Sequence, residues 1–230
     1  MEITPNSGTG SGPITPDGSP VEFYKLVPVG AEPDIVAGVV PAGGSVLDLG
    51  AGVGRVTHPL VERGYEVVAV DESAEMLAEV RGAETVRSRI QDLRLGRRFD
   101  GVLLASHLVH TADEAGRQGL LEACARHVAD DGAVLIQWLP PEAHDAQAPG
   151  QGRTDGGFRI ELAALERVAP GVVNATMRYR HGEHEWTQSF TSRRLSDEEL
   201  ARALEEAGLR LAGFLTKDRG WVKAVPLSGG

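Results

Sequence analysis

Three glycines at alternate positions follow a short apolar run and precede a segment with helical periodicity. They are Gly50, Gly52 and Gly54 in the run VLDLGAGVGRVT. A chain that turns sharply after a strand needs residues without a Cβ, and the same absence lets a ligand approach the backbone closely. Asp71 ends the next apolar run, where a carboxylate can accept hydrogen bonds from two ribose hydroxyls. The combination predicts a nucleotide-binding loop between a strand and a helix.

Two other nucleotide-binding loops fit this spacing less well. A dinucleotide loop carries a third glycine three residues after its second, and this chain has Arg55 there. A Walker loop needs Gly-Lys-Ser or Gly-Lys-Thr after four residues, and the sequence contains neither. The loop therefore disfavours a nicotinamide-dependent oxidoreductase.

A sheet must position these residues, and from Val46 to Leu139 the chain alternates apolar runs with helical segments. The apolar runs are SVLDLG, YEVVAVD, a weaker TVRSRI, DGVLLAS and GAVLIQWL. The helical segments between them are THPLVERG, SAEMLAEVRG and EAGRQGLLEACARHVADDG. Such alternation is typical of a parallel sheet with helices in its crossovers, so we expect an α/β fold.

The pattern changes after Leu139. Residues 140–157 are rich in Pro, Gly and polar residues, which predicts a mobile lid or an unstructured excursion. RIELAALERV, VVNATMRYRHG and HEWTQSFTSRRL then show partial alternation, which predicts inserted antiparallel strands over about residues 157–195. Ser196 and Glu199 have the spacing of a capping box, and LRLAGFL and GWVKAVPL follow as two last strands.

The domain organisation follows from these segments. Residues 1–20 offer little apolar surface to offset the entropy of ordering, so we expect a flexible tail. The remaining residues, 21–230, are long enough for one elaborated domain rather than two, so we expect a single domain that carries the insertion.

The successive motifs resemble those of class I S-adenosylmethionine-dependent methyltransferases. They are DLGAGVGRVT, VVAVDESAEML, IQDL, FDGVLLASHLVH and AVLIQWLPP, over roughly residues 40–141. The resemblance implies a Rossmann-like, mostly parallel sheet of seven strands, with the antiparallel segment inserted after the fifth. It also implies S-adenosyl-L-methionine as methyl donor and S-adenosyl-L-homocysteine as its product.

The resemblance also implies which residues contact this cofactor. Asp48 and the glycine loop would face the methionine portion, and Asp71 would take the ribose hydroxyls. Asp92 would accept from the adenine amino group, beside the Leu93 amide. The alternative for Asp71 and Asp92 is a solvated carboxylate at a strand end. The expected cofactor-binding residues are Asp48, Gly50, Ala51, Gly52, Gly54, Asp71, Glu72, Met76, Gln91, Asp92, Leu93, Ala105 and Ser106.

Methyl transfer is an in-line displacement, so the protein mainly aligns the acceptor, and a general base is an optional addition. His107 follows the fourth strand, at the edge where such sheets place their sites, and is our candidate base. The alternative is that His107 packs against the cofactor or caps the next helix. Metal-dependent relatives carry acidic ligands where this chain has Ala105, Ser106 and His107, so we expect no metal.

Several polar and aromatic residues could shape the acceptor pocket, although each is also an ordinary packing residue. They are Tyr24, His110, Trp138, Arg178 and Trp186, and for His110 a structural role is the preferred interpretation. The pair Arg97 and Arg98 is expected to form a solvated turn rather than an anion site.

Charge and hydropathy limit the partners. The net charge of -10 opposes binding to a phosphate backbone, so we expect no nucleic acid. No apolar run approaches 18 residues and no secretion signal opens the chain, so we expect no membrane and a cytoplasmic location. The single cysteine, Cys124, lies on an apolar helix face and is expected to be buried.

The function expected from these patterns is methyl transfer to an N or O atom of a small molecule, in bacterial secondary metabolism. The alternative is a methyltransferase-like protein that binds the cofactor but catalyses another reaction or serves as a partner subunit. A homodimer and a complex with a partner subunit both stay open.

Overall fold

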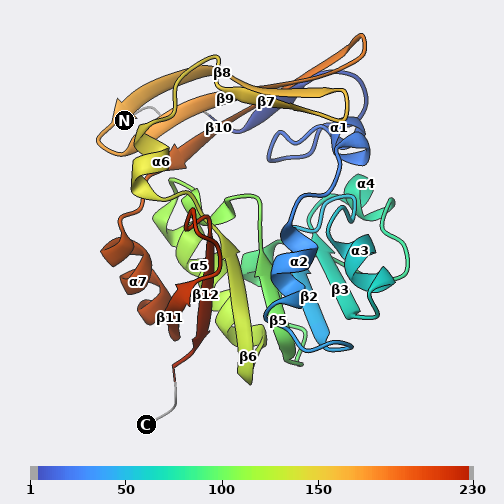
Figure 1. The fold of residues 1–230 in the computed structure, drawn as a ribbon, viewed down its shortest axis with the longest axis vertical. Coiled ribbons are helices and arrows are strands. Elements are labelled where there is room, and N and C mark those ends of the chain that lie inside the picture. The colour runs from blue at the N-terminus through green and yellow to red at the C-terminus, as the bar shows by residue number, and fades with distance from the viewer. Residues whose placement is uncertain (1–4, 228–230) are drawn as a thin grey trace. The chain divides into compact units, whose positions relative to one another are not determined.

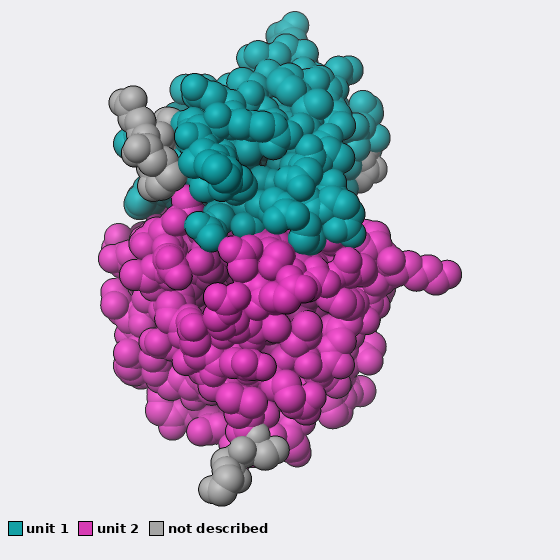
Figure 2. Space-filling model, turned by 90° about the vertical axis from the view of Figure 1, so that its left-hand side faces the viewer, with its two compact units in different colours: residues 1–28, 141–194 teal, residues 29–140, 195–230 magenta. Residues whose placement is uncertain are grey.

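The computed structural model describes residues 5–227, which fold into two compact units (Figures 1 and 2). The larger unit contains residues 29–140 and the segment from residue 195 onward. The smaller unit contains the segment up to residue 28 together with residues 141–194.

The larger unit is built on a seven-stranded sheet with the order β11-β12-β6-β5-β2-β3-β4. Its central strands run parallel, while β12 is antiparallel to β6 and β11 is antiparallel to β12. The strands are β2 (Ser45–Leu49), β3 (Glu66–Asp71), β4 (Glu84–Arg87), β5 (Phe99–Leu104), β6 (Val128–Gln137), β11 (Leu209–Phe214) and β12 (Trp221–Pro226).

Helices cover both faces of this sheet (Figure 1). They are α2 (Glu32–Ala37), α3 (Thr57–Glu62), α4 (Ala74–Leu77), α5 (Glu114–His127) and α7 (Asp197–Glu206), with the 3-10 turns η1 (Ile90–Asp92) and η2 (Leu108–His110). Alternation along β2 sends Val46 into the core under α2 and α3, and Leu47 and Leu49 into the core under α5 and α7. Cys124 on α5 is fully buried, as predicted.

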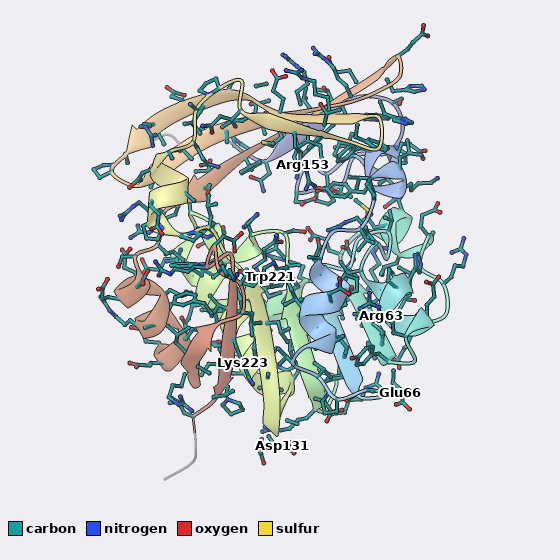
Figure 3. The ribbon with its side chains drawn as sticks, viewed as in Figure 1. Arg63, Glu66, Asp131, Arg153, Trp221 and Lys223 are labelled. Carbon is teal, nitrogen blue, oxygen red and sulfur yellow. The ribbon has the colours of Figure 1, made fainter. Side chains whose placement is uncertain are left out.

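The parallel strands share one direction, which sorts the loops to two edges of the sheet. Glu66 and Asp131, labelled in Figure 3, lie at the edge where β3 and β6 begin. Trp221 pairs with Gln137 and so marks the opposite edge, where β6 ends. The glycine loop after β2 and the residues that follow β3 and β5 all belong to this second edge. In open α/β sheets it is the carboxyl edge that holds the ligand.

The sequence-based expectations for this unit are confirmed in fold class and strand direction. The five apolar runs correspond to β2 through β6, and the two last runs to β11 and β12. The predicted capping box also forms, because Ser196 Oγ accepts from the Glu199 N–H and the Glu199 carboxylate accepts from the Ser196 N–H.

The smaller unit is an antiparallel five-stranded sheet with the order β1-β10-β9-β8-β7. Its elements are β1 (Ser7–Thr9), α1 (Val21–Leu26), α6 (Pro141–Asp145), β7 (Gly152–Asp155), β8 (Phe158–Ala169), β9 (Val172–His181) and β10 (His184–Arg193). The three longest strands are the three inserted runs expected from the sequence. No helix within residues 5–227 is both long and apolar enough to cross a membrane.

Two segments that the sequence assigned to irregular chain are ordered here. Residues 1–4 of the expected tail lie outside the described residues. Within residues 5–20, β1 pairs with β10, and Trp186 Nε1 donates to the Ser11 carbonyl at 2.9 Å. The expected lid, residues 140–157, contains α6 and β7. Both segments pair their backbone with the inserted strands, and local composition cannot show a partner that lies 175 residues away in the sequence. The expected single domain is accordingly divided into two units, and the N-terminal segment belongs with the insertion.

The N-terminal segment can be tested by truncation. A chain without residues 1–12 loses the β1–β10 pairing and exposes Trp186, which is only 1% exposed in the structure. We expect a loss of about 2 kcal/mol in the free energy of unfolding, and a red shift of tryptophan emission. Urea unfolding followed by fluorescence measures both, and a chain without residues 1–4 is the control. If the two truncated chains are equally stable, the original prediction of a flexible tail would be correct.

Candidate functional site

The glycine loop is tied to the end of the neighbouring strand. The Gly50 and Ala51 N–H groups both donate to the Val70 carbonyl, at 2.8 and 2.9 Å. The Gly52 N–H donates to Asp71 Oδ2 at 2.9 Å. These three bonds fix the path of the loop over the carboxyl end of β3.

Backbone conformation explains why the loop needs glycine. The φ angles of Gly50, Gly52 and Gly54 are +74°, +57° and +83°, all in the left-handed region. A Cβ on Gly54 would stand 2.8 Å from His58 Nε2, whereas a Cβ on Gly52 would meet nothing closer than Met76 Sδ at 3.7 Å. At Gly52 the positive φ, rather than a steric clash, is therefore what favours glycine.

Asp71 holds the loop as well as facing it. Its Oδ1 accepts from the Ser73 N–H at 2.9 Å, while its Oδ2 accepts from Gly52. These two bonds tie the end of β3 to both the glycine loop and the turn into α4. The structure thus adds a positioning role to the ligand-binding role that the sequence suggested.

Asp48 is buried beneath the loop, with 2% of its surface exposed. Its Oδ2 accepts from Thr57 Oγ1 at 2.7 Å, so α3 begins against this carboxylate. Burial raises the pKa of Asp48 to about 6, although the Thr57 bond and the charge of Arg55 oppose that rise.

Arg55 and Glu32 form an ion pair beside Asp48 that sequence reasoning missed. Arg55 Nη2 lies 2.7 Å from Glu32 Oε1, and both side chains are mostly buried. Burial acts to raise the pKa of Glu32, but the bond and charge of Arg55 outweigh it and leave that pKa below its ordinary value. Arg55, which appeared only as a departure from the dinucleotide pattern, thus joins the loop to α2.

The turns after β4 and β5 approach the loop at Gly50. A Cβ on Gly50 would stand 3.0 Å from Leu108 Cδ1 and 3.8 Å from Ile90 Cδ1. The η1 and η2 turns therefore adjoin the glycine loop, which brings Asp92 and the residues before Leu108 to the same edge. In the sheet, β5 is the neighbour of β2 on one side, while β3 and then β4 follow on the other side.

The remaining expected cofactor residues differ in exposure. Glu72 and Asp92 are exposed, whereas Ala51, Met76, Leu93 and Ala105 are buried. Gln91 lies close to Gly119, because its Cγ is 2.8 Å from where a Cβ on Gly119 would stand. Its side chain packs against α5, which a glycine in that helix permits.

Ser106 and His107 are strained where β5 ends. Their φ angles are +55° and +56°, and both side chains are exposed. Left-handed backbone costs non-glycine residues about 1–3 kcal/mol each, and such strain clusters at functional sites. Gln137 Oε1 accepts from the Ser106 N–H at 2.8 Å and so helps to hold this conformation from the end of β6. Sequence reasoning did not identify Gln137.

Three of the residues considered for the acceptor pocket are buried, which for His110 agrees with the preferred structural role. His110 Nε2 accepts from the Leu139 N–H at 2.8 Å, and its ring stacks on Trp138. Trp138 is fully buried and donates to the Arg219 carbonyl. Trp186 is buried beside Phe23. Burial leaves these rings almost no surface for a ligand. His110 and Trp138 therefore pack inside the larger unit, and Trp186 packs inside the smaller unit.

The other two expected acceptor residues are half-buried in the smaller unit. The Tyr24 hydroxyl donates to Gln188 Oε1 at 3.3 Å. Arg178 lies between Glu161 and Glu185, at 3.9 and 3.7 Å. Within residues 5–227, no group of three or more His, Cys, Asp or Glu side chains could hold a metal ion.

The pKa of Asp48 predicts how stability depends on pH. A carboxyl whose pKa rises from 3.8 to about 6 on folding binds more protons in the folded state between those values, so stability falls as pH rises through that range. Asp48→Asn removes this loss and can still accept from Thr57. We compare the free energy of unfolding of the variant with that of the wild type at each pH. This difference should be about 3 kcal/mol more favourable to the variant at pH 7 than at pH 4.

Asp100→Asn is the matched control, with the opposite sign. Two bonds from Ser45, through its N–H and its hydroxyl, hold the pKa of Asp100 below its ordinary value. Its replacement should therefore destabilise the protein at pH 7. Urea unfolding at several pH values measures both variants, and a pH-independent effect of Asp48→Asn would show that Asp48 is not a buried, weakened acid.

The chain is similar to known methyltransferases. Residues 46–132 match the family described as a methyltransferase domain. The cypemycin N-terminal methyltransferase of a Streptomyces species is 32% identical over 159 residues, 63% of this chain and 64% of that protein. A ubiquinone biosynthesis O-methyltransferase of Xanthomonas axonopodis pv. citri is 26% identical over 206 residues, 85% of this chain and 74% of that protein.

A solved structure shows the same fold. The CcbJ methyltransferase of Streptomyces caelestis matches with a TM-score of 0.73 at 20% identity, over 90% of this chain and 96% of that one. The chain spans slightly less than two thirds of the cypemycin enzyme. Residues 46–132 are therefore similar in sequence to a methyltransferase domain, and the chain shares the fold of a known methyltransferase.

Proposed function

We propose that this protein binds S-adenosyl-L-methionine and transfers its methyl group to an N or O atom of a small molecule, leaving S-adenosyl-L-homocysteine. The observation that carries the proposal is the glycine loop bonded to Asp71 at the carboxyl edge of the sheet, with its glycines in left-handed conformations. A bacterial, cytoplasmic role in secondary metabolism is part of the proposal.

The hydrogen bonds of the loop distinguish this cofactor from a dinucleotide. Four N–H groups of the loop already donate to protein oxygens, those of Gly50, Ala51, Gly52 and Gly54. A pyrophosphate is held by loop and helix N–H groups that point at it, and this loop has few to offer. A cofactor that has a ribose but no phosphate suits the loop better.

The carboxylates at this edge suit the rest of the cofactor. Asp71 lies beside Gly52, where a carboxylate could accept from ribose hydroxyls, and Asp92 is exposed on η1, where it could accept from an adenine amino group. When bound, the cofactor supplies a methyl group on a positively charged sulfur. The protein's contribution is alignment, which can lower the barrier by about 7–11 kcal/mol.

His107 is the residue we propose for proton removal. It is exposed at the end of β5, and its left-handed backbone sets the direction in which the side chain leaves the main chain. A base at this position would take the proton that a hydroxyl acceptor loses as the new bond forms, whereas a neutral amine needs alignment first.

The relatives support both acceptor atoms. One is named an N-terminal methyltransferase and another an O-methyltransferase. The net charge of -10 fits a small-molecule acceptor rather than nucleic acid.

Asp71→Asn tests the cofactor site. The substitution removes the charge that strengthens bonds from ribose hydroxyls, so we expect S-adenosylmethionine to bind about 10- to 100-fold more weakly. Isothermal titration calorimetry measures the affinity, and Asp130→Asn, which changes an exposed carboxylate at the other edge, is the control. Unchanged affinity in a folded variant would remove Asp71 from the site, and binding of NAD instead would reject the proposed cofactor.

His107→Asn tests the base. Asparagine tolerates left-handed backbone, so the turn should survive. If His107 takes the acceptor's proton, cofactor affinity should stay near that of the wild type while turnover falls by roughly 100- to 10,000-fold. The assay follows S-adenosylhomocysteine formation with an amine and with a phenol, and His184→Asn, an exposed histidine of β10, is the control. Wild-type turnover with both acceptors would leave alignment as the source of catalysis.

A further inference from the structure

Four arginines surround one hollow of the larger unit, away from the glycine loop. The hollow has a volume of about 380 Å³ and is lined by Arg94, Gly96, Arg97, Arg98, Arg126 and His127. These residues directly precede β5 and β6, so they lie at the edge where the parallel strands begin. Six residues of β5 separate the two edges by about 20 Å.

Two of the arginines are neutralised by carboxylates. Arg97 Nη2 lies 2.5 Å from Glu84 Oε2, and Arg98 Nη1 lies 2.9 Å from Asp130 Oδ1. Both arginines are exposed, which agrees with the solvated turn expected for this pair.

The other two arginines converge without a counter-ion. Arg94 Nη1 and Arg126 Nη1 both donate to the Leu93 carbonyl, at 2.7 and 3.2 Å, which brings the two guanidinium groups close together. Arg94 Nη1 also donates to the Gln91 carbonyl. Within the described residues, neither arginine forms an ion pair with a carboxylate.

The electrostatic effect appears in Arg126. Burial first, and then the charge of Arg94, hold the pKa of Arg126 below its ordinary value, while Glu122 acts in the opposite direction. The chain as a whole has a net charge of -10, so two neighbouring cationic side chains that repel one another form a local positive region in a negatively charged protein.

The neutral side chain of His127 lines one side of the hollow. Its Nε2 lies 3.1 Å from the Leu95 N–H and therefore accepts, so its Nδ1 carries the proton and donates to the Ala123 carbonyl at 2.7 Å. Gly96 has a φ of +68° and no atom within 4 Å of a Cβ position, which leaves the entrance open.

We propose that Arg94 and Arg126 bind the phosphoryl group of a small phosphorylated molecule in this hollow. Each guanidinium is a planar fork of N–H donors, and the bonds described use only one nitrogen of each. Two forks match a tetrahedral dianion with several oxygens, whereas one carboxylate occupies one fork. The site lies outside the cofactor-binding edge, and the proposal does not depend on methyl transfer.

Binding of inorganic phosphate and phenyl phosphate to the full chain tests the proposal. At constant ionic strength set with sodium chloride, we expect at least one of them to bind by calorimetry and to raise the melting temperature. In Arg94→Gln/Arg126→Gln the affinity should fall at least tenfold. Arg202→Gln/Arg210→Gln makes the same charge change at exposed positions and should stay within twofold of the wild type. Tighter binding of phenyl phosphate would identify a phosphate ester as the ligand. Equal affinity for phenyl phosphate and inorganic phosphate would identify the free anion.

Location is tested by chemical modification. Phenylglyoxal labels accessible arginines, and phosphate should protect Arg94 and Arg126 from it more than Arg202. Arg94→Lys keeps the charge but loses the fork, so its affinity should lie between those of the wild type and the double variant. Equal binding by the double variant, an equal effect of sodium chloride alone, or unprotected Arg94 and Arg126 would each overturn the proposal.

Discussion

The bond between the Gly52 N–H and Asp71 is the constraint on which the functional edge depends. It joins the loop after one parallel strand to the end of the next, and it uses a carboxylate that also begins the turn into α4. Since the N–H groups of Gly50, Ala51 and Gly54 also donate to protein carbonyls, the shape of the loop is set before any ligand arrives. Preorganisation of this kind lowers the entropic cost of binding.

Charge is distributed unevenly over the larger unit. The edge where the parallel strands end carries Asp48, Asp71 and Asp92, which suits a ligand with a positive centre. The edge where they begin carries the unpaired Arg94 and Arg126. Because every central strand runs the same way, residues before strands and residues after strands are sorted to opposite edges, and two ligands of opposite charge can be served by one sheet.

The proposed base lies where the backbone is most strained. Ser106 and His107 hold left-handed conformations that glycine would adopt at lower cost. Gln137 Oε1 accepts a hydrogen bond from the Ser106 N–H, which helps to keep this conformation. His110, for which the sequence favoured a structural role, stacks on the buried Trp138 and accepts from the Leu139 N–H, so both rings support this turn. The core and the strained turn are thus parts of one arrangement.

The sequence by itself determined the parallel sheet, the glycine loop, the place of Asp71 and the capping box at Ser196. Each is a local pattern: alternation sets the face of a strand, glycine spacing sets a turn, and a capping residue sets where a helix begins. Only the tertiary structure decided that Glu32 pairs with Arg55, that Trp186 is buried by the N-terminal segment, and that Arg94 meets Arg126. These contacts join residues far apart in the chain, and a linear pattern states which face a side chain occupies but not which distant residue the fold brings against it.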